Sequence, residues 1–183
     1  VGEDQKQHIE LTRELARLFN WLCGDAFVVP ESMVAPAGAK IMALDNPTKK
    51  MEKTGSQEGY IALTDGTDVI AKKIRRAVTD SGSEIVYDPK KKPALANLLT
   101  IYHLLGGDEI SVIEERYRGK GYAQFKSDLS DVVIAFLAPI QATFHELMAD
   151  TKNLERMLAD GAAEAHLHAQ KKITLIKERM GLL

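Results

Sequence analysis

Two lysines, Lys50 and Lys53, stand three residues apart in the segment 45–56. The segment contains Pro47 and Gly55 among polar residues, a composition typical of a loop rather than a packed element. Lysine is a flexible point charge that can follow a phosphate group as it moves during a reaction. Because fixed cations stabilise charge that develops on phosphate oxygens, this loop is a candidate triphosphate clamp. Charge alone leaves a second interpretation open, a solvated basic turn.

The elements that must position this loop are short apolar pieces and amphipathic helices. Leucines recur at three- and four-residue steps in the segment 5–22 and predict an amphipathic helix. We expect Trp21 and Cys23 to be core residues. Phe27-Val28-Val29, stopped by Pro30, predicts a buried strand. Further short apolar pieces lie at 41–44, where the chain leads into the lysine loop, and at 60–63. We expect Ile41 to lie at the end of a strand. From about residue 66 the pattern predicts helices at 69–78, 93–106, 108–117, 125–148 and 151–179.

Composition bounds the kind of protein. A chain of 183 residues can bury a real core. It has no apolar run near the roughly 18 residues that a membrane span needs, so we expect no membrane association and a cytoplasmic location. The single cysteine excludes an internal disulfide, and the scattered histidines predict no metal site. A net charge of −2 means that nucleic-acid binding would depend on local basic patches.

The residues 50–54, Lys-Met-Glu-Lys-Thr, resemble the Lys-Met-Ser-Lys-Ser signature of class I aminoacyl-tRNA synthetases. Further segments resemble the tryptophanyl-tRNA synthetase family, in that family's order and at about its spacing. These segments are 1–8, 39–42, 46–50, 77–81, 97–102 and 119–122. The resemblance therefore extends over nearly the whole chain.

This resemblance implies a fold of the class α/β plus all-α. Residues 1–65 would be the C-terminal part of a Rossmann-like catalytic domain, residues 66–150 a helical anticodon-binding domain, and residues 151–183 a helix that packs back toward the catalytic part. The chain opens on a motif at Val1, and we find no counterpart of the family's first ATP motif. We therefore expect a C-terminal portion that lacks the N-terminal half.

The resemblance also implies an activity and its partners. The complete enzyme would be a tryptophan–tRNA ligase that uses ATP with Mg²⁺ to activate tryptophan and then transfers it to tRNA(Trp). The family works as a cytoplasmic homodimer. The portion in hand would be inactive alone, because half of the nucleotide fold and the amino-acid pocket would be missing.

The family's functional residues can be carried over position by position. Lys50 and Lys53 would be catalytic, holding the pyrophosphate as it leaves the α-phosphorus. ATP would be bound by Gly2, Glu3, Asp4, Ile41, Lys50, Met51, Glu52, Lys53 and Thr54, and Gln5 would lie near the amino acid. No residue is expected to bind a metal.

The lysine loop departs from the family pattern at two positions. Thr54 keeps the hydroxyl of the usual serine, whereas Glu52 puts a carboxylate in place of a neutral serine. Near a triphosphate this carboxylate is repulsive unless it turns to solvent or pairs with Lys49. The substitution puts the affinity for ATP in question.

Three other interpretations remain open from the sequence. A tyrosyl-tRNA synthetase shares the lysine loop but fits the segments 2–7 and 79–81 less well. A non-catalytic tRNA-binding or regulatory module could be built from the same fold, and a helical scaffold with chance matches is the plainest alternative. The basic clusters at 72–76 and 90–92 could contact tRNA phosphates, but for Lys72, Lys73 and Arg76 we expect a solvated helix face.

Overall fold

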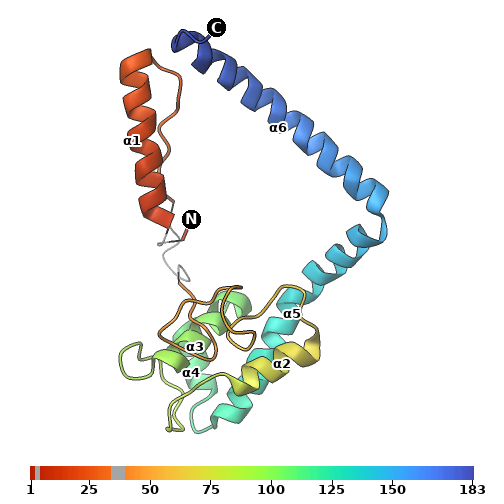
Figure 1. The fold of residues 1–183 in the computed structure, drawn as a ribbon. Helices are drawn as coiled ribbons and strands as arrows, with labels where there is room; N and C mark the ends of the chain where they lie inside the picture. The colour runs from red at the N-terminus through yellow and green to blue at the C-terminus, as the bar shows by residue number, and fades with distance from the viewer. Residues whose placement is uncertain (3–4, 34–39) are drawn as a thin grey trace. The chain divides into compact units, whose positions relative to one another are not determined.

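The computed structural model describes residues 1–2, 5–33 and 40–183 (Figure 1). Secondary structure in these residues is helical: α1 (Lys6–Cys23), α2 (Thr67–Arg76), α3 (Pro93–Gly106), α4 (Ile110–Arg116), α5 (Tyr122–Ala149) and α6 (Thr151–Arg179). The chain divides into two compact units. One consists of residues 1–35 with 145–183, and the other of residues 36–144.

The predicted helices are confirmed, two of them at the predicted residues. The first of these two, α3, begins at Pro93, where the missing amide hydrogen of proline costs nothing in the first turn of a helix. It ends before Gly107, whose φ of 79° is a left-handed conformation that glycine adopts readily. The second, α6, ends before Gly181 in the same conformation, at a φ of 70°. The helix α5 runs through Pro139 without a break in its assignment.

The buried strand predicted at Phe27-Val28-Val29 is wrong. These residues have no regular secondary structure, and Val28 is 92% exposed. A strand needs a neighbouring backbone to pair with, and here the side chain of Asn20 takes that place. Its Oδ1 accepts hydrogen bonds from the amides of Ala26 (3.0 Å) and Phe27 (2.9 Å), and its Nδ2 donates to the Phe27 carbonyl at 2.8 Å.

The expectation that Trp21 is a core residue is also wrong. Its side chain is 80% exposed, and Cys23 is half-buried. The apolar stripe of α1 exists as predicted, but its leucines remain more than half exposed within the described residues: Leu11, Leu15, Leu18 and Leu22. Periodicity correctly predicts a helix here, but it does not show what covers the apolar face.

The core of residues 36–144 is built around α3. Four of its side chains are at most 5% exposed and pack with residues from α2, α4 and α5. The α3 side chains are Leu95, Leu98, Leu99 and Tyr102, and their partners include Ile70, Ile74, Ile113, Tyr117, Phe125, Leu129 and Val133. Because α3 is apolar on several sides, it supplies a rigid centre against which the loops of this unit can be fixed.

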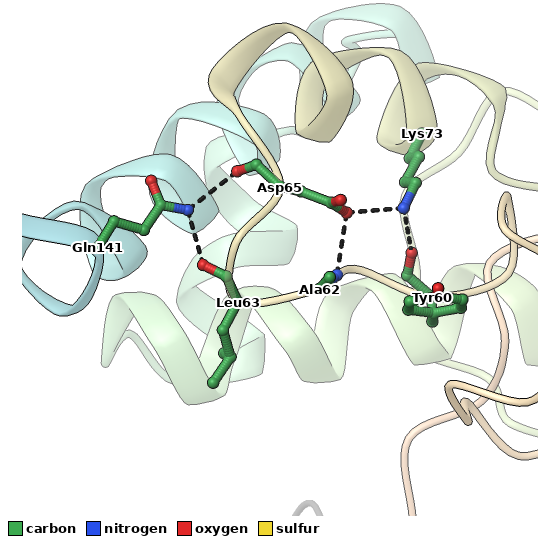
Figure 2. Close-up of polar contacts among 6 residues, drawn as sticks. All are labelled: Tyr60, Ala62, Leu63, Asp65, Lys73 and Gln141. Atoms are coloured by element: carbon green, nitrogen blue, oxygen red, sulfur yellow. Dashed lines mark hydrogen bonds and ion pairs between the residues drawn. The ribbon is translucent and has the colours of Figure 1, made fainter. Parts of the chain in front are cut away.

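A buried ion pair connects α2 to the segment that follows the lysine loop (Figure 2). Lys73 was expected on a solvated face, but its ammonium lies 2.6 Å from the Asp65 carboxylate and donates to the Tyr60 carbonyl at 2.9 Å. Gln141 of α5 donates to the carbonyls of Leu63 (2.8 Å) and Asp65 (2.9 Å). Lys73 can be buried because the Asp65 carboxylate and the Tyr60 carbonyl replace the water around its ammonium, as a buried charge requires.

By length and mean hydropathy alone, α5 could cross a membrane. The core helix of a soluble protein passes the same test, so this is weak evidence. Several of its side chains, including Phe125, Leu129, Val133 and Leu137, lie in the core described above.

The ion pair yields a prediction for stability. Asp65→Ala leaves the Lys73 ammonium buried without its counter-charge, and we expect the free energy of unfolding to fall by about 3–5 kcal/mol. Glu58→Ala is the control, because the Glu58–Arg76 pair is exposed at both side chains and its loss should cost less than about 1 kcal/mol. Urea unfolding measures both. Equal losses in the two variants would contradict the assignment of a structural role to the buried pair.

Candidate functional site

The lysine loop is closed at its base by a short antiparallel pairing. Met42 and Lys50 form an isolated β-bridge, and hydrogen bonds of 2.9 Å flank it on both sides. In one the Ala43 amide donates to the Lys49 carbonyl, and in the other the Met51 amide donates to the Ile41 carbonyl. Next to Ile41, where the end of a strand was expected, the structure has a single bridging residue, Met42, and this bridge fixes the backbone of Lys50.

A second set of contacts closes the loop farther along the chain. The Leu44 amide donates to the Gly59 carbonyl at 2.9 Å, and the Ser56 hydroxyl donates to the carboxylate of Asp45. The Leu44 carbonyl accepts a hydrogen bond of 2.8 Å from the amide of Val78. Both ends of the loop are therefore held, which confines any movement to the residues between them.

Apolar side chains on the underside of the loop pack onto the helical core. Ile41 and Met51 are half-buried against it, together with Ile61. They line one wall of an apolar groove of about 230 Å³, and the other wall comes from α3 and α5 through Ile101, Leu104, Leu105, Val133, Phe136 and Leu137. In this structure Ile41 and Met51 pack the loop onto the core, and Lys50 and Lys53 are exposed.

The tip of the loop is exposed. The Gly55 amide donates to the Glu52 carbonyl at 3.1 Å, so Lys53 and Thr54 occupy the centre of a turn. Lys53 makes no hydrogen bond or ion pair with the residues that the structure describes. The side chain of Glu52 is exposed and makes no ion pair with Lys49 in this part of the chain. Of the two possibilities for Glu52, the structure shows the one in which it faces solvent.

The remaining predicted site residues lie in the other unit. Gly2 accepts a hydrogen bond from the Gln5 amide at 2.9 Å, directly before α1. Glu3 and Asp4 lie outside the described residues. The structure brings Ile41 and the residues 50–54 together in one loop, whereas the place of Gly2 and Gln5 relative to that loop stays a prediction.

Three residues that fix the loop, Asn97, Gly59 and Asp45, were not predicted to be part of the site from the sequence. Asn97 of α3 forms two hydrogen bonds of 2.8 Å with the backbone of Met42. Gly59 is buried, and a β-carbon there would lie 2.6 Å from the Oδ1 of Asp45. The available signal for Asn97 was an amide in the middle of an otherwise apolar helix, since a buried polar side chain must find a partner.

The segment 77–84 joins the loop base to α5 through Asp80. The Asp80 carboxylate accepts hydrogen bonds of 2.7 Å from the Tyr122 hydroxyl and the Gly82 amide, and the Lys92 ammonium lies 3.9 Å away. Burial opposes ionisation of Asp80, but these three partners together hold its pKa below its usual value. Burial and the neighbouring carboxylate raise the pKa of Tyr122, so its hydroxyl stays a donor.

Lys126 of α5 holds the same segment from a second side. Its ammonium donates to the Ala77 carbonyl at 2.7 Å, and the carbonyl of Arg75 and the hydroxyl of Thr79 lie at 3.4 and 3.5 Å. Burial lowers the pKa of Lys126. Through Val78, which donates to Leu44, these contacts stabilise the base of the lysine loop.

A loop fixed at its base that presents Lys53 at an exposed tip can follow and neutralise phosphate groups. Comparison with known proteins gives this geometry a context. The profile of the family described as "tRNA synthetases class I (W and Y)" matches residues 1–138. The chain belongs to this family.

Individual members of the class I synthetases are similar over the whole chain. The tryptophan–tRNA ligase of Bacillus subtilis is 46% identical over 183 residues, covering 100% of this chain and 55% of the relative. That of Caldanaerobacter subterraneus is 45% identical over 184 residues, covering 100% of this chain and 56% of the relative. The chain thus spans about half the length of these relatives.

The fold is also similar to that of solved tryptophanyl-tRNA synthetases. The tryptophanyl-tRNA synthetase of Mycoplasma pneumoniae superposes with a TM-score of 0.88 at 31% identity, over 99% of this chain and 55% of that one. The enzyme of Campylobacter jejuni, solved with ADP and tryptophan, superposes with a TM-score of 0.71 at 31% identity, over 99% of this chain and 56% of that one.

The packing around Gly59 makes a prediction about the loop base. In Gly59→Ala the new methyl group displaces the Asp45 carboxylate that accepts from Ser56, which should cost about 1–3 kcal/mol of local stability. We expect trypsin to cleave after Lys49, Lys50 and Lys53 faster than in the parent chain. Gly66→Ala is the control, since a β-carbon at Gly66 meets nothing within 4 Å. Equal cleavage rates in both variants would show that the contact does not hold the loop.

Proposed function

We propose that the full-length protein that contains this chain is a tryptophan–tRNA ligase. It activates tryptophan with ATP as an aminoacyl adenylate and transfers it to tRNA(Trp). The observation that carries the proposal is the geometry of the lysine loop. Its base is fixed by the bridge between Met42 and Lys50, and Lys53 is exposed at its tip. Similarity to tryptophan–tRNA ligases over the entire chain supports the choice of amino acid.

In this proposal the lysines act on the leaving group. When the tryptophan carboxylate attacks the α-phosphorus, negative charge grows on the departing pyrophosphate, and a cation held there lowers the barrier. Lys53 occupies the turn and can reach outward, while the backbone of Lys50 is fixed by the bridge to Met42. Thr54 offers a hydroxyl to the same phosphates. ATP enters with Mg²⁺ as the substrate complex.

The other predicted contacts would complete the site. Gly2, Glu3 and Asp4 would meet the adenosine, with the carboxylates toward ribose hydroxyls, and Gln5 would lie near tryptophan. Ile41 would contact the adenine. These roles are supported by the resemblance of segments 1–8 and 39–42 to the family.

The domain assignment follows the same proposal. Residues 1–65 would be the C-terminal part of a Rossmann-like catalytic domain, 66–150 the anticodon-binding domain, and 151–183 a helix that returns to the catalytic part. The contact of Lys172 in α6 with the Ala26 carbonyl (2.5 Å) supports the last assignment. We further propose a cytoplasmic homodimer, and residues 1–183 alone are expected to be inactive.

The test of the proposal is tryptophan-dependent exchange of pyrophosphate into ATP, measured on the full-length gene product. Lys53→Ala removes the charge at the leaving group, and we expect a loss of about 3 kcal/mol, or about a hundredfold in rate. Lys91→Ala is the control, because Lys91 is an exposed lysine outside the loop. A loss of less than about threefold in Lys53→Ala would refute this role.

Glu52 replaces a serine of the family pattern and bears on whether the protein is a ligase or a non-catalytic module of the same fold. Its exposed carboxylate repels the phosphates of ATP as they approach the tip, so Glu52→Ser is expected to bind ATP more tightly, by up to about fivefold. Isothermal titration of ATP into the full-length gene product measures this change. An unchanged affinity would count against the repulsion. Absence of any tryptophan-dependent exchange in the parent protein would favour the module.

A further inference from the structure

The extended backbone at Met42 has two hydrogen-bonding edges, and only one of them faces the lysine loop. The hydrogen bonds that flank its bridge to Lys50 come from Ala43 and from Ile41, the residues on either side of it. In an antiparallel pairing, the amide and carbonyl of the residue between such bonds point away from the paired strand. The N–H and C=O of Met42 therefore point to the side opposite Lys50.

Asn97 meets both of these groups. Its Oδ1 accepts from the Met42 amide at 2.8 Å, and its Nδ2 donates to the Met42 carbonyl at 2.8 Å. A side-chain amide carries the same donor and acceptor as a peptide group. Asn97 thus pairs with Met42 as a neighbouring strand would, and Met42 lies between Asn97 on one side and Lys50 on the other.

The helix that carries Asn97 gives this pairing a fixed reference. Asn97 is 8% exposed, and its neighbours Leu98 and Leu99 are 1% and 0% exposed. Side chains in such a packed core have little freedom to shift. The position of Asn97 is therefore determined by the core of the unit and not by the loop.

We propose that Asn97 is a positioning residue for the lysine loop. It ties the backbone of Met42 to α3 and, through the bridge, sets the position of Lys50. It acts through Met42 and contacts no substrate itself. The catalytic part of this inference rests on the proposed function, whereas the effect on the loop backbone does not.

The test uses Asn97→Ala and Asn97→Asp in the full-length gene product. The alanine removes both hydrogen bonds. The aspartate keeps nearly the same shape and the acceptor for the Met42 amide, but it sets a carboxylate oxygen against the Met42 carbonyl. Because Asn97→Asp also buries a charge, the amides of α4 and α5 distinguish a local effect on Met42 from a general loss of core stability. Thr100→Val is the matched control, because it removes one side-chain hydrogen bond within α3, to the Ala96 carbonyl, and leaves Met42 untouched.

Amide hydrogen exchange is the first measurement. We expect the amides of Ala43 and Met51 to exchange about tenfold faster in both Asn97 variants, and that of Met42 to do so in Asn97→Ala, while amides of α4 and α5 keep the parent rates. Unchanged exchange at these three amides would overturn the inference whatever the enzymatic result, because the loop would then not depend on Asn97.

Pyrophosphate exchange is the second measurement. Both variants are expected to lose about tenfold or more in kcat while the KM for tryptophan changes less than about twofold, since Lys50 is displaced and the amino-acid pocket is not. A loss no larger than that of Thr100→Val would overturn the positioning role. If the parent protein shows no tryptophan-dependent exchange, the proposed function fails, and hydrogen exchange alone decides the role of Asn97.

Discussion

The pairing of Met42 with Lys50 is the contact on which the candidate site depends. It is only one residue long, yet it determines where the lysine loop leaves the core. A single bridge is too weak to hold a loop by itself, because each hydrogen bond contributes only about 1 kcal/mol net. The bridge persists because its other side is held by Asn97 and its apolar neighbours, Ile41 and Met51, are seated on the core.

The parts of the loop differ in freedom for physical reasons. At the base, hydrogen bonds and buried side chains restrain the backbone through Leu44, Asp45 and Gly59. At the tip, Lys53 and Thr54 are exposed, and Lys53 makes no polar contact with the described residues. A fixed base holds the backbone of Lys50 in place, and an exposed tip lets the charge of Lys53 follow a phosphate group as it moves. This division suits the role in adenylate formation that we propose for the loop.

The helices could be predicted from the sequence because their signals are local. Pro93 and Gly107 mark the ends of α3, and Gly181 follows the end of α6, so the residues themselves carry the boundary information. The strand at 27–29 could not be predicted correctly, because strand formation depends on a partner backbone and Asn20 satisfies those groups instead. The prediction that Lys73 lies on a solvated helix face was wrong for the same reason, since its burial depends on Asp65, a partner outside its own helix.

The candidate site shows the same limit. The spacing and type of Lys50 and Lys53 are visible in the sequence, and the structure places Ile41 and residues 50–54 in one loop. Asn97 is 55 residues from its partner Met42, and Gly59 and Asp45 depend on a close approach that no local pattern records. Chemistry-bearing residues can thus be read from local sequence, whereas the residues that hold them are found only from the fold.

The most direct test of the central claim is a crystal structure of the full-length gene product with bound ATP. We expect the ammonium groups of Lys50 and Lys53 to lie about 2.7–2.9 Å from oxygens of the β- or γ-phosphate, the range of a charge-assisted hydrogen bond. A complex in which ATP is bound and both lysines point to solvent, away from the phosphates, would contradict the assignment of the loop.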